Sequence, residues 1–307
     1  MRIGIMATGA LGGYYGARLA AAGHDVVFFA RGAQLAALRD NGLKLESPLG
    51  DLHLPRVNAS GDPASAGQMD IVLFAVKLWD TEKAARDMRP IVGANTRIIS
   101  LQNGVDSVDI LRSVLGEAHI IGGSAYMGGV VASPGVIRQT TTASHIVCGP
   151  PGGGRDEVVE NFAAIAARAG VEVRISDDVT RDLWQKFVFL VALSGSTAST
   201  RQNLGPVLAD ADTRKLFVDL ASEAVAVGCA RGVALEADLA ARTLEFASGF
   251  PPGHRASTLN DLERGNRLEV DWLTGRVVSL GAATGIPTPV SAAVYAVLKP
   301  HRMGKQG

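Results

Sequence analysis

The sequence places one lysine where it could act as a proton donor. Lys186 stands in the stretch LWQKFVFLVAL, directly before a run of apolar residues. Burial in such surroundings lowers the pKa of a lysine toward the range that is useful for proton transfer near neutral pH. An ammonium group of this kind can polarise a carbonyl and then supply a proton to its oxygen. On its own, Lys186 is more readily interpreted as a lysine whose stem lies along the apolar edge of a helix.

A glycine-rich turn near the start of the chain has the residue types of a nucleotide-binding loop. It lies in the stretch IGIMATGALGGYYG, after an apolar run typical of a strand and before small residues that can begin a helix. Such a turn brings backbone N–H groups against a pyrophosphate at the start of a helix. We therefore predict cofactor binding by the six residues of the turn, Ala7, Thr8, Gly9, Ala10, Leu11 and Gly12.

Ala7 stands where this fingerprint has its first glycine. The alanine is costly only if the backbone there needs a positive φ, which glycine adopts freely. A tight turn without a ligand is the alternative interpretation. The position of the turn between the first predicted strand and the first predicted helix favours the nucleotide.

The end of the second predicted strand indicates which nucleotide would bind. An NAD site usually has an acidic residue about 20 residues after the glycines, where it binds the ribose 2′-hydroxyl. This chain has Arg31 at that point, and a guanidinium suits a 2′-phosphate. The sequence therefore predicts NADPH/NADP as the cofactor, with a solvated surface arginine as the alternative.

These residues need elements to position them, and the first half of the chain alternates between strand-like and helix-like segments. We predict strands at 2–7, 25–30, 70–76, 96–102, 119–125, 144–149 and 171–176, and helices at 14–23, 31–42 and 81–93. Such alternation indicates βαβ units and a mostly parallel sheet. Residues 1–176 are thus predicted to form a Rossmann domain, in which the glycine-rich segment 149–157 is a surface loop.

The pattern changes from about Thr180 onward, where helical periodicity dominates. We predict helices at 181–195, 213–232 and 269–285, and find no persuasive strand. Residues 177–307 are therefore predicted to form an all-helical domain.

Composition limits the classes of ligand and location. The 307 residues carry 30 basic and 30 acidic side chains, so no overall field favours nucleic acid or an anionic membrane. The two cysteines have no metal-ligand spacing, and no metal site is expected. The longest apolar run, FVFLVAL, is too short to span a bilayer, and the N-terminus does not have the pattern of a signal peptide. We predict a cytoplasmic protein with a small-molecule substrate.

Five stretches together resemble a known family nearly from end to end. They are GALGGYYGARLAAAGHDVVFFAR, FAVKLWD, LQNGV, LWQKFVFLVALSGSTA and STLNDLERGNRLEVDWLTG, and they resemble the ketopantoate reductase (2-dehydropantoate 2-reductase) family. The resemblance implies NADPH-dependent reduction of a 2-oxo acid to a 2-hydroxy acid, in pantothenate biosynthesis. It also implies a cleft between the Rossmann domain and a helical domain of the 6-phosphogluconate dehydrogenase-like type. We expect a homodimer.

The resemblance also implies roles for individual residues. Lys186 corresponds to the catalytic acid, and Asn103 to an asparagine that contacts both nicotinamide and substrate. Lys77 and Met127 fall at the cofactor site. The remaining two, Ser257 and Glu269, fall at the substrate and nicotinamide end. Glu269 is the second expected catalytic residue and would favour the charged form of the lysine.

Two positions depart from the family pattern. The family has asparagines four and eight residues after the catalytic lysine, where they bind substrate, whereas this chain has Leu190 and Ser194. Leucine offers no hydrogen bond, so a different 2-oxo acid is one expectation. A further family asparagine falls near Asn203.

Alternatives remain at the level of residues and of function. Asn103 could be a turn residue, and Ser257 could be a helix N-cap. An NADP(H)-binding sensor without turnover and a dehydrogenase of another hydroxy acid are the alternative functions.

Overall fold

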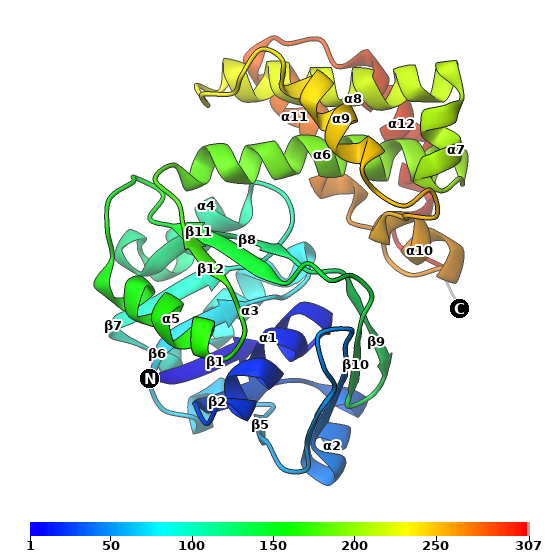
Figure 1. Ribbon diagram of the computed structural model, residues 1–307. Coiled ribbons are helices and arrows are strands. Elements are labelled where there is room, and N and C mark those ends of the chain that lie inside the picture. The colour runs from blue at the N-terminus through cyan, green and yellow to red at the C-terminus, as the bar shows by residue number, and fades with distance from the viewer. Residues whose placement is uncertain (306–307) are drawn as a thin grey trace. The chain divides into compact units, whose positions relative to one another are not determined.

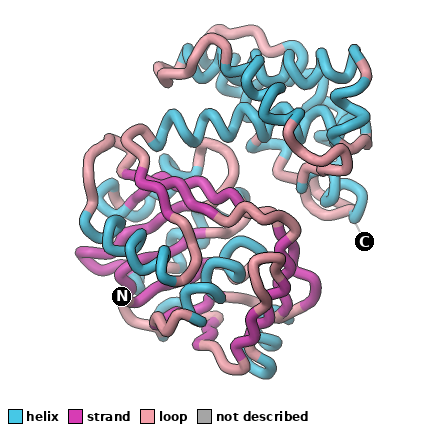
Figure 2. Tube along the Cα trace, in the orientation of Figure 1, coloured by secondary structure: helices cyan, strands magenta, loops and turns pink. Residues whose placement is uncertain are grey.

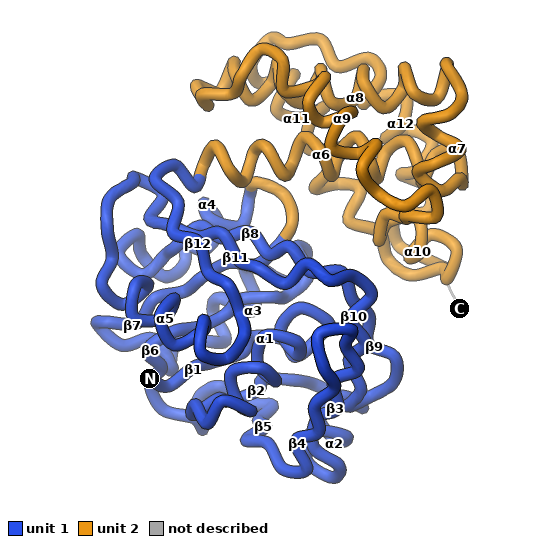
Figure 3. Tube along the Cα trace, viewed as in Figure 1, with its two compact units in different colours: residues 1–102, 106–179 blue, residues 103–105, 180–307 orange. Residues whose placement is uncertain are grey.

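The computed structural model describes residues 1–305, which divide into two compact units. Unit 1 comprises residues 1–102 and 106–179, and unit 2 comprises residues 103–105 and 180–307 (Figure 3). All strands of the described chain belong to unit 1 (Figure 2). The predicted α/β fold with a helical C-terminal domain is confirmed.

Unit 1 is built on an eight-stranded sheet. Its order is β12 (Val173–Ile175), β11 (His145–Gly149), β8 (Ile120–Tyr126), β7 (Val92–Ser100), β6 (Met69–Phe74), β1 (Arg2–Met6), β2 (Asp25–Phe29) and β5 (Asn58–Ser60). Every neighbouring pair is parallel except β8 and β11. The central strands form because their side chains are buried on both faces, which explains their near-continuous apolar sequences.

Helices follow several of these strands, as Figure 1 shows. They are α1 (Ala10–Ala21), α2 (Gly32–Asn41), α3 (Thr81–Asp87), α4 (Ser107–Leu115) and α5 (Glu157–Arg168). The helix predicted at 81–93 is too long, because Pro90 removes a backbone donor and disfavours helical geometry before it. Asp156 caps α5 by accepting hydrogen bonds from the N–H groups of Val158 and Val159, at 3.0 and 3.1 Å.

A second sheet of four strands was not predicted. Its order is β4 (Leu52–Leu54), β3 (Leu43–Glu46), β10 (Val136–Gln139) and β9 (Gly129–Ser133). The sequence does hold a hairpin signal, since Pro134 and Gly135 join β9 to β10 and Gly135 has a φ of 79°. The sheet packs on α1 so closely that a Cβ on Gly13 would lie 2.7 Å from the side chain of Ile137.

Unit 2 consists of helices around one apolar core. They are α6 (Val179–Thr200), α7 (Leu204–Ala209), α8 (Ala211–Ala230), α9 (Leu239–Ser248), α10 (Ser257–Arg264), α11 (Thr274–Thr284) and α12 (Pro289–Leu298). Phe187 and Val191 of α6 pack there with Phe217 of α8. Gly195 lets the helices approach, because a Cβ there would lie 2.8 Å from Leu220.

The helix predicted at 269–285 starts later than expected. Residues Val270–Trp272 form a 3-10 turn, η5, and α11 begins only at Thr274. Leu273 has φ −112° and ψ −103°, which is not helical geometry and separates the two. The remaining 3-10 turns are η1 (Pro63–Ser65), η2 (Leu78–Asp80), η3 (Arg89–Ile91), η4 (Glu117–His119) and η6 (Lys299–His301). No helix in residues 1–305 is both long enough and apolar enough to cross a membrane.

Candidate functional site

The carboxyl ends of the central strands of unit 1 lie at one edge of the large sheet. In the parallel register Met6 is paired with both Phe29 and Phe74, and Phe74 is paired with Ser100. The chain reverses its strand order around β1, which has β2 on one side and β6 on the other. Ligands of α/β sheets bind at the carboxyl ends of strands where the order reverses in this way.

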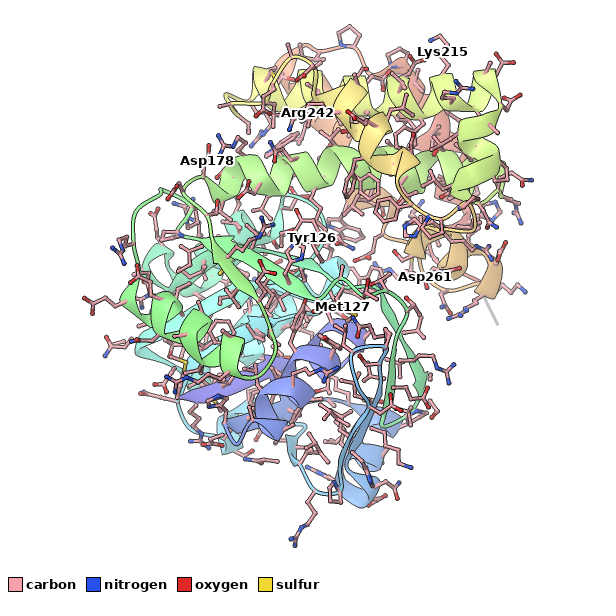
Figure 4. All side chains as sticks on the ribbon, viewed as in Figure 1. Tyr126, Met127, Asp178, Lys215, Arg242 and Asp261 are labelled. Carbon is pink, nitrogen blue, oxygen red and sulfur yellow. The ribbon has the colours of Figure 1, made fainter. Side chains whose placement is uncertain are left out.

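Four of the predicted cofactor segments follow these strand ends. The turn from Ala7 to Gly12 follows β1, Arg31 follows β2, Lys77 follows β6, and Met127 follows β8. Figure 4 labels Met127 beside Tyr126, the last residue of β8. Residues far apart in the sequence are thus brought to the same edge of unit 1.

The glycine-rich turn is tight and contains one strained residue. Ala7 has a φ of 75°, so the alanine occupies the left-handed region that favours glycine. Gly12 is tightly confined, because a Cβ there would lie 2.3 Å from the carbonyl oxygen of Ala7. Gly9 faces open space, since a Cβ there would meet no atom within 4 Å.

The start of α1 suits an anion. Gly9 is its N-cap and has no side chain to accept hydrogen bonds from the first turn, which also contains no acidic residue. The first N–H groups of a helix lack partners within the helix and carry partial positive charge. These residues therefore fit a pyrophosphate through their backbone.

Thr8 contributes to the turn differently from its neighbours. Its backbone N–H and its hydroxyl both donate to the carbonyl oxygen of Phe29, at 3.0 and 3.1 Å. The side chain is buried, so it ties the turn to β2 and leaves only backbone groups for a ligand.

Gln34 also holds this turn and was not identified from the sequence. Its Nε2 donates to the carbonyl oxygen of Thr8 at 3.0 Å, and its Oε1 accepts from the N–H of Gly135 at 3.0 Å. The glutamine thus connects the turn to the hairpin of the second sheet. No signal in the sequence could have revealed this link, because Gly135 lies 101 residues further on.

Arg31 is exposed and forms a weak ion pair. Its Nη2 lies 3.2 Å from Oδ2 of Asp87, which also binds Lys83 at 2.7 Å. Solvent-exposed pairs of this kind contribute little stability, so a phosphate can replace the carboxylate at small cost.

A buried hydrogen-bond network supports the ends of β6 and β7. Nε2 of Gln102 donates to the carbonyl oxygen of Val76 at 3.0 Å and to Oγ1 of Thr81 at 2.7 Å. Val76 directly precedes Lys77, and Gln102 directly precedes Asn103. Gln102 was not predicted, although it stands inside the LQNGV stretch.

Lys77 and Asn103 differ in their surroundings. Lys77 is exposed, and its Nζ lies 5.6 Å from the ring centroid of Trp79. Asn103 is partly buried and belongs with Gly104 and Val105 to unit 2, where Val105 packs against the core. Gly104 has a φ of 86°, and the chain bends at Asn103 and Gly104.

In unit 2 the predicted proton donor lies on α6. Lys186 is partly buried, and burial lowers the pKa of its ammonium group to about 8. Further round the helix, Phe187 and Val191 are fully buried. The lowered pKa brings proton transfer close to the physiological range.

The other predicted residues of unit 2 lie on three segments. Leu190 and Ser194 follow Lys186 on α6, one and two turns further on. Glu269 is 9% exposed and precedes η5, which its side chain does not cap. Ser257 is exposed in the first turn of α10, whose N-cap is Ala256, so the interpretation of Ser257 as an N-cap is wrong. Asn203 is the N-cap residue of α7, but its side chain makes no capping hydrogen bond.

Comparison with known proteins connects both units to one family. Residues 3–153 match the family described as "Ketopantoate reductase PanE/ApbA", and residues 178–302 match "Ketopantoate reductase PanE/ApbA C terminal". The chain belongs to the ketopantoate reductase family. A 2-dehydropantoate 2-reductase of Mesorhizobium japonicum is 31% identical over 320 residues, covering 97% of each chain.

Solved structures of ketopantoate reductases agree with this fold. A family member from Ralstonia eutropha has a TM-score of 0.90 and 36% identity, covering 98% of each chain. A 2-dehydropantoate 2-reductase from Geobacter metallireducens has a TM-score of 0.90 and 32% identity, covering 98% of this chain and 99% of the other. D-mandelate dehydrogenase, at a TM-score of 0.89 and 16% identity, shares the fold.

Proposed function

We propose that the protein is an NADPH-dependent reductase that converts 2-dehydropantoate or a related 2-oxo acid to the 2-hydroxy acid. The observation that carries the proposal is Lys186, a partly buried lysine whose pKa is lowered to about 8 on a helix of a ketopantoate reductase fold. When bound, NADPH would supply a hydride for the carbonyl carbon of the substrate. Lys186 polarises the carbonyl and gives its proton to the oxygen.

Each part of the chain has one task in this reaction. Residues 1–176 bind the cofactor, with the pyrophosphate on the backbone of the turn from Ala7 to Gly12. Arg31 binds the 2′-phosphate, because its guanidinium is exposed and its present ion pair is weak. Residues 177–307 supply Lys186.

The remaining contacts follow the family resemblance. The proposed cofactor contacts are Lys77, Asn103, Met127 and Glu269, and the proposed substrate contacts are Asn103, Leu190, Ser194 and Ser257. Glu269 stabilises the protonated form of Lys186. We also infer a cytoplasmic homodimer.

NADPH oxidation with 2-dehydropantoate tests the function. Replacing Lys186 by methionine removes the proton donor and keeps a long side chain, so we expect kcat to fall about 100-fold or more while NADPH still binds. Lys215→Met is the matched control. This lysine lies on α8 and is labelled in Figure 4. Its Nζ pairs with Oδ2 of Asp219 at 2.6 Å.

The outcomes separate the candidate functions. Wild-type turnover that survives in Lys186→Met would contradict the proposed role of the lysine. A wild-type protein that binds NADPH and reduces no 2-oxo acid would instead be a sensor. A higher kcat/KM with NADPH than with NADH is expected in the same assay, and the reverse preference would remove the role of Arg31.

A further inference from the structure

The face of α6 that carries Lys186 becomes apolar one turn further on. At about 100° per residue, Phe189 and Leu190 lie roughly 60° to one side and 40° to the other side of Lys186. All three side chains are partly buried, whereas Phe187 and Val188 between them are fully buried. Lys186, Phe189 and Leu190 therefore share one face of the helix.

Phe189 is held in place by two further aromatic rings. It stacks on Phe250 with ring centroids 5.6 Å apart and meets the edge of Phe246 at 5.1 Å. Phe246 is 54% exposed, so the cluster of three rings leaves hydrocarbon at the surface. Leu190 packs against the core of unit 2 on the other side of the lysine. The surface on this part of α6 is thus apolar.

Ser194 is the polar group on the same face, and its hydroxyl has no partner. Hydroxyl groups later in α6 donate to the carbonyl oxygen four residues earlier, as seen for Ser196, Thr197, Ser199 and Thr200. Ser194 is only 4% exposed, yet its side chain makes no hydrogen bond within the described chain. Its Oγ is not among the fully buried side-chain oxygens that lack a partner, so the hydroxyl reaches the surface and is available to a ligand.

We propose that the substrate is a 2-oxo acid with a hydrocarbon side chain, and that Leu190 selects it. The inference rests on the proposed function of Lys186. Leu190 lies between Lys186 and Ser194 along α6, so the part of a substrate that spans these two groups faces a leucine. A substrate hydroxyl that faces Leu190 loses its hydrogen bonds to water on binding and gains none from the leucine side chain. A branched alkyl or aromatic group loses nothing and buries apolar surface.

A pair of substrates that differ by one hydroxyl tests this selection. Trimethylpyruvate has the carbon skeleton of 2-dehydropantoate without its terminal hydroxyl. For the wild type we expect kcat/KM to favour trimethylpyruvate by about 10- to 100-fold, the range over which an apolar site rejects an added hydroxyl. Leu190→Asn supplies a hydrogen-bonding group and is expected to reverse the preference.

Two further variants control for effects on folding. Leu190→Ala keeps the position apolar, so the preference for trimethylpyruvate should persist. Leu208→Asn introduces the same polar side chain at another partly buried leucine, on α7 against the same core, and should leave the ratio unchanged. The ratio of two substrates on one preparation is insensitive to the fraction of folded enzyme.

Selection by Leu190 and the reductase function can fail separately in these assays. A wild-type preference for 2-dehydropantoate, or a ratio that Leu190→Asn does not change, would overturn the selection by Leu190 and leave the reductase function intact. Phenylpyruvate is an aromatic 2-oxo acid that can be assayed in the same way. If trimethylpyruvate, 2-dehydropantoate and phenylpyruvate all fail to oxidise NADPH, the reductase function is wrong and this inference falls with it.

Discussion

Ala7 is the residue at which sequence and backbone geometry conflict. Its φ of 75° follows from the tight turn between β1 and α1, and the carbonyl oxygen of Ala7 lies against Gly12. A residue with a Cβ in the left-handed region of φ and ψ lowers the stability of the fold by about 1–3 kcal/mol. The neighbouring hydrogen bonds of Thr8 must offset this strain. The turn is therefore fixed by its neighbours rather than by the preference of its own first residue.

Replacing Ala7 by glycine should stabilise the protein. We expect the free energy of unfolding to rise by about 1 kcal/mol, because glycine adopts this φ without a clash. Urea denaturation measures the change. In Ala36→Gly, at an exposed position within α2, the same substitution should lower the free energy of unfolding by about 0.5–1 kcal/mol. An Ala7→Gly protein no more stable than wild type would show that the turn holds no strain.

Lys186 should give the reaction a characteristic pH dependence. Burial lowers its pKa to about 8, so the ammonium form that donates the proton is lost above that pH. We expect kcat/KM for reduction to be level below about pH 8 and then to fall about tenfold per pH unit. Oxidation of the hydroxy acid, which needs the neutral amine, should rise and reach a plateau over the same range. A pH profile that breaks near the ordinary lysine pKa, for the reduction or for the oxidation, would contradict the effect of burial.

At the scale of elements, the ends of neighbouring strands carry the proposed cofactor contacts, and Gln102 holds two of these ends together. Its bonds to Val76 and Thr81 fix β6 and β7 at the points where Lys77 and Asn103 follow. These bonds are buried, so their loss leaves acceptors without a partner.

Gln102→Met keeps the size of the side chain and removes its hydrogen bonds. We expect the free energy of unfolding to fall by about 2 kcal/mol and the Kd for NADPH to rise. Gln139→Met is the matched control, since Gln139 is equally buried and donates to the carbonyl oxygen of Ala143 at 3.1 Å in a loop beside the second sheet. Equal changes in Kd for the two variants would show that Gln102 acts only through overall stability.

The elements also show what sequence reasoning can reach. The long apolar strands and the helices of unit 2 were predictable because their periodicity extends over many residues. The second sheet was missed because β4 has three residues and β3 and β10 have four each, too few to show a period. Its Pro-Gly turn was the one local signal.

At the scale of the whole molecule, the family and the two-part architecture could be predicted, because the matching stretches run nearly the full length of the chain. The strain at Ala7 and the links made by Gln34 and Gln102 could not, because each depends on backbone geometry or on partners distant in sequence. The unbonded hydroxyl of Ser194 likewise required a structure, since neighbouring hydroxyls on the same helix are bonded.

The assignment of Asn103–Val105 to unit 2 has a consequence for recombination between related genes. A single crossover at residues 179 and 180 would exchange the helical unit except for these three residues, which would remain those of the other parent. Val105 of one parent would then pack against the core of the other. A functional chimera therefore requires that Asn103–Val105 be exchanged together with the segment from residue 180 onward. Exchange of the helical unit then needs three junctions, after residues 102, 105 and 179, rather than one.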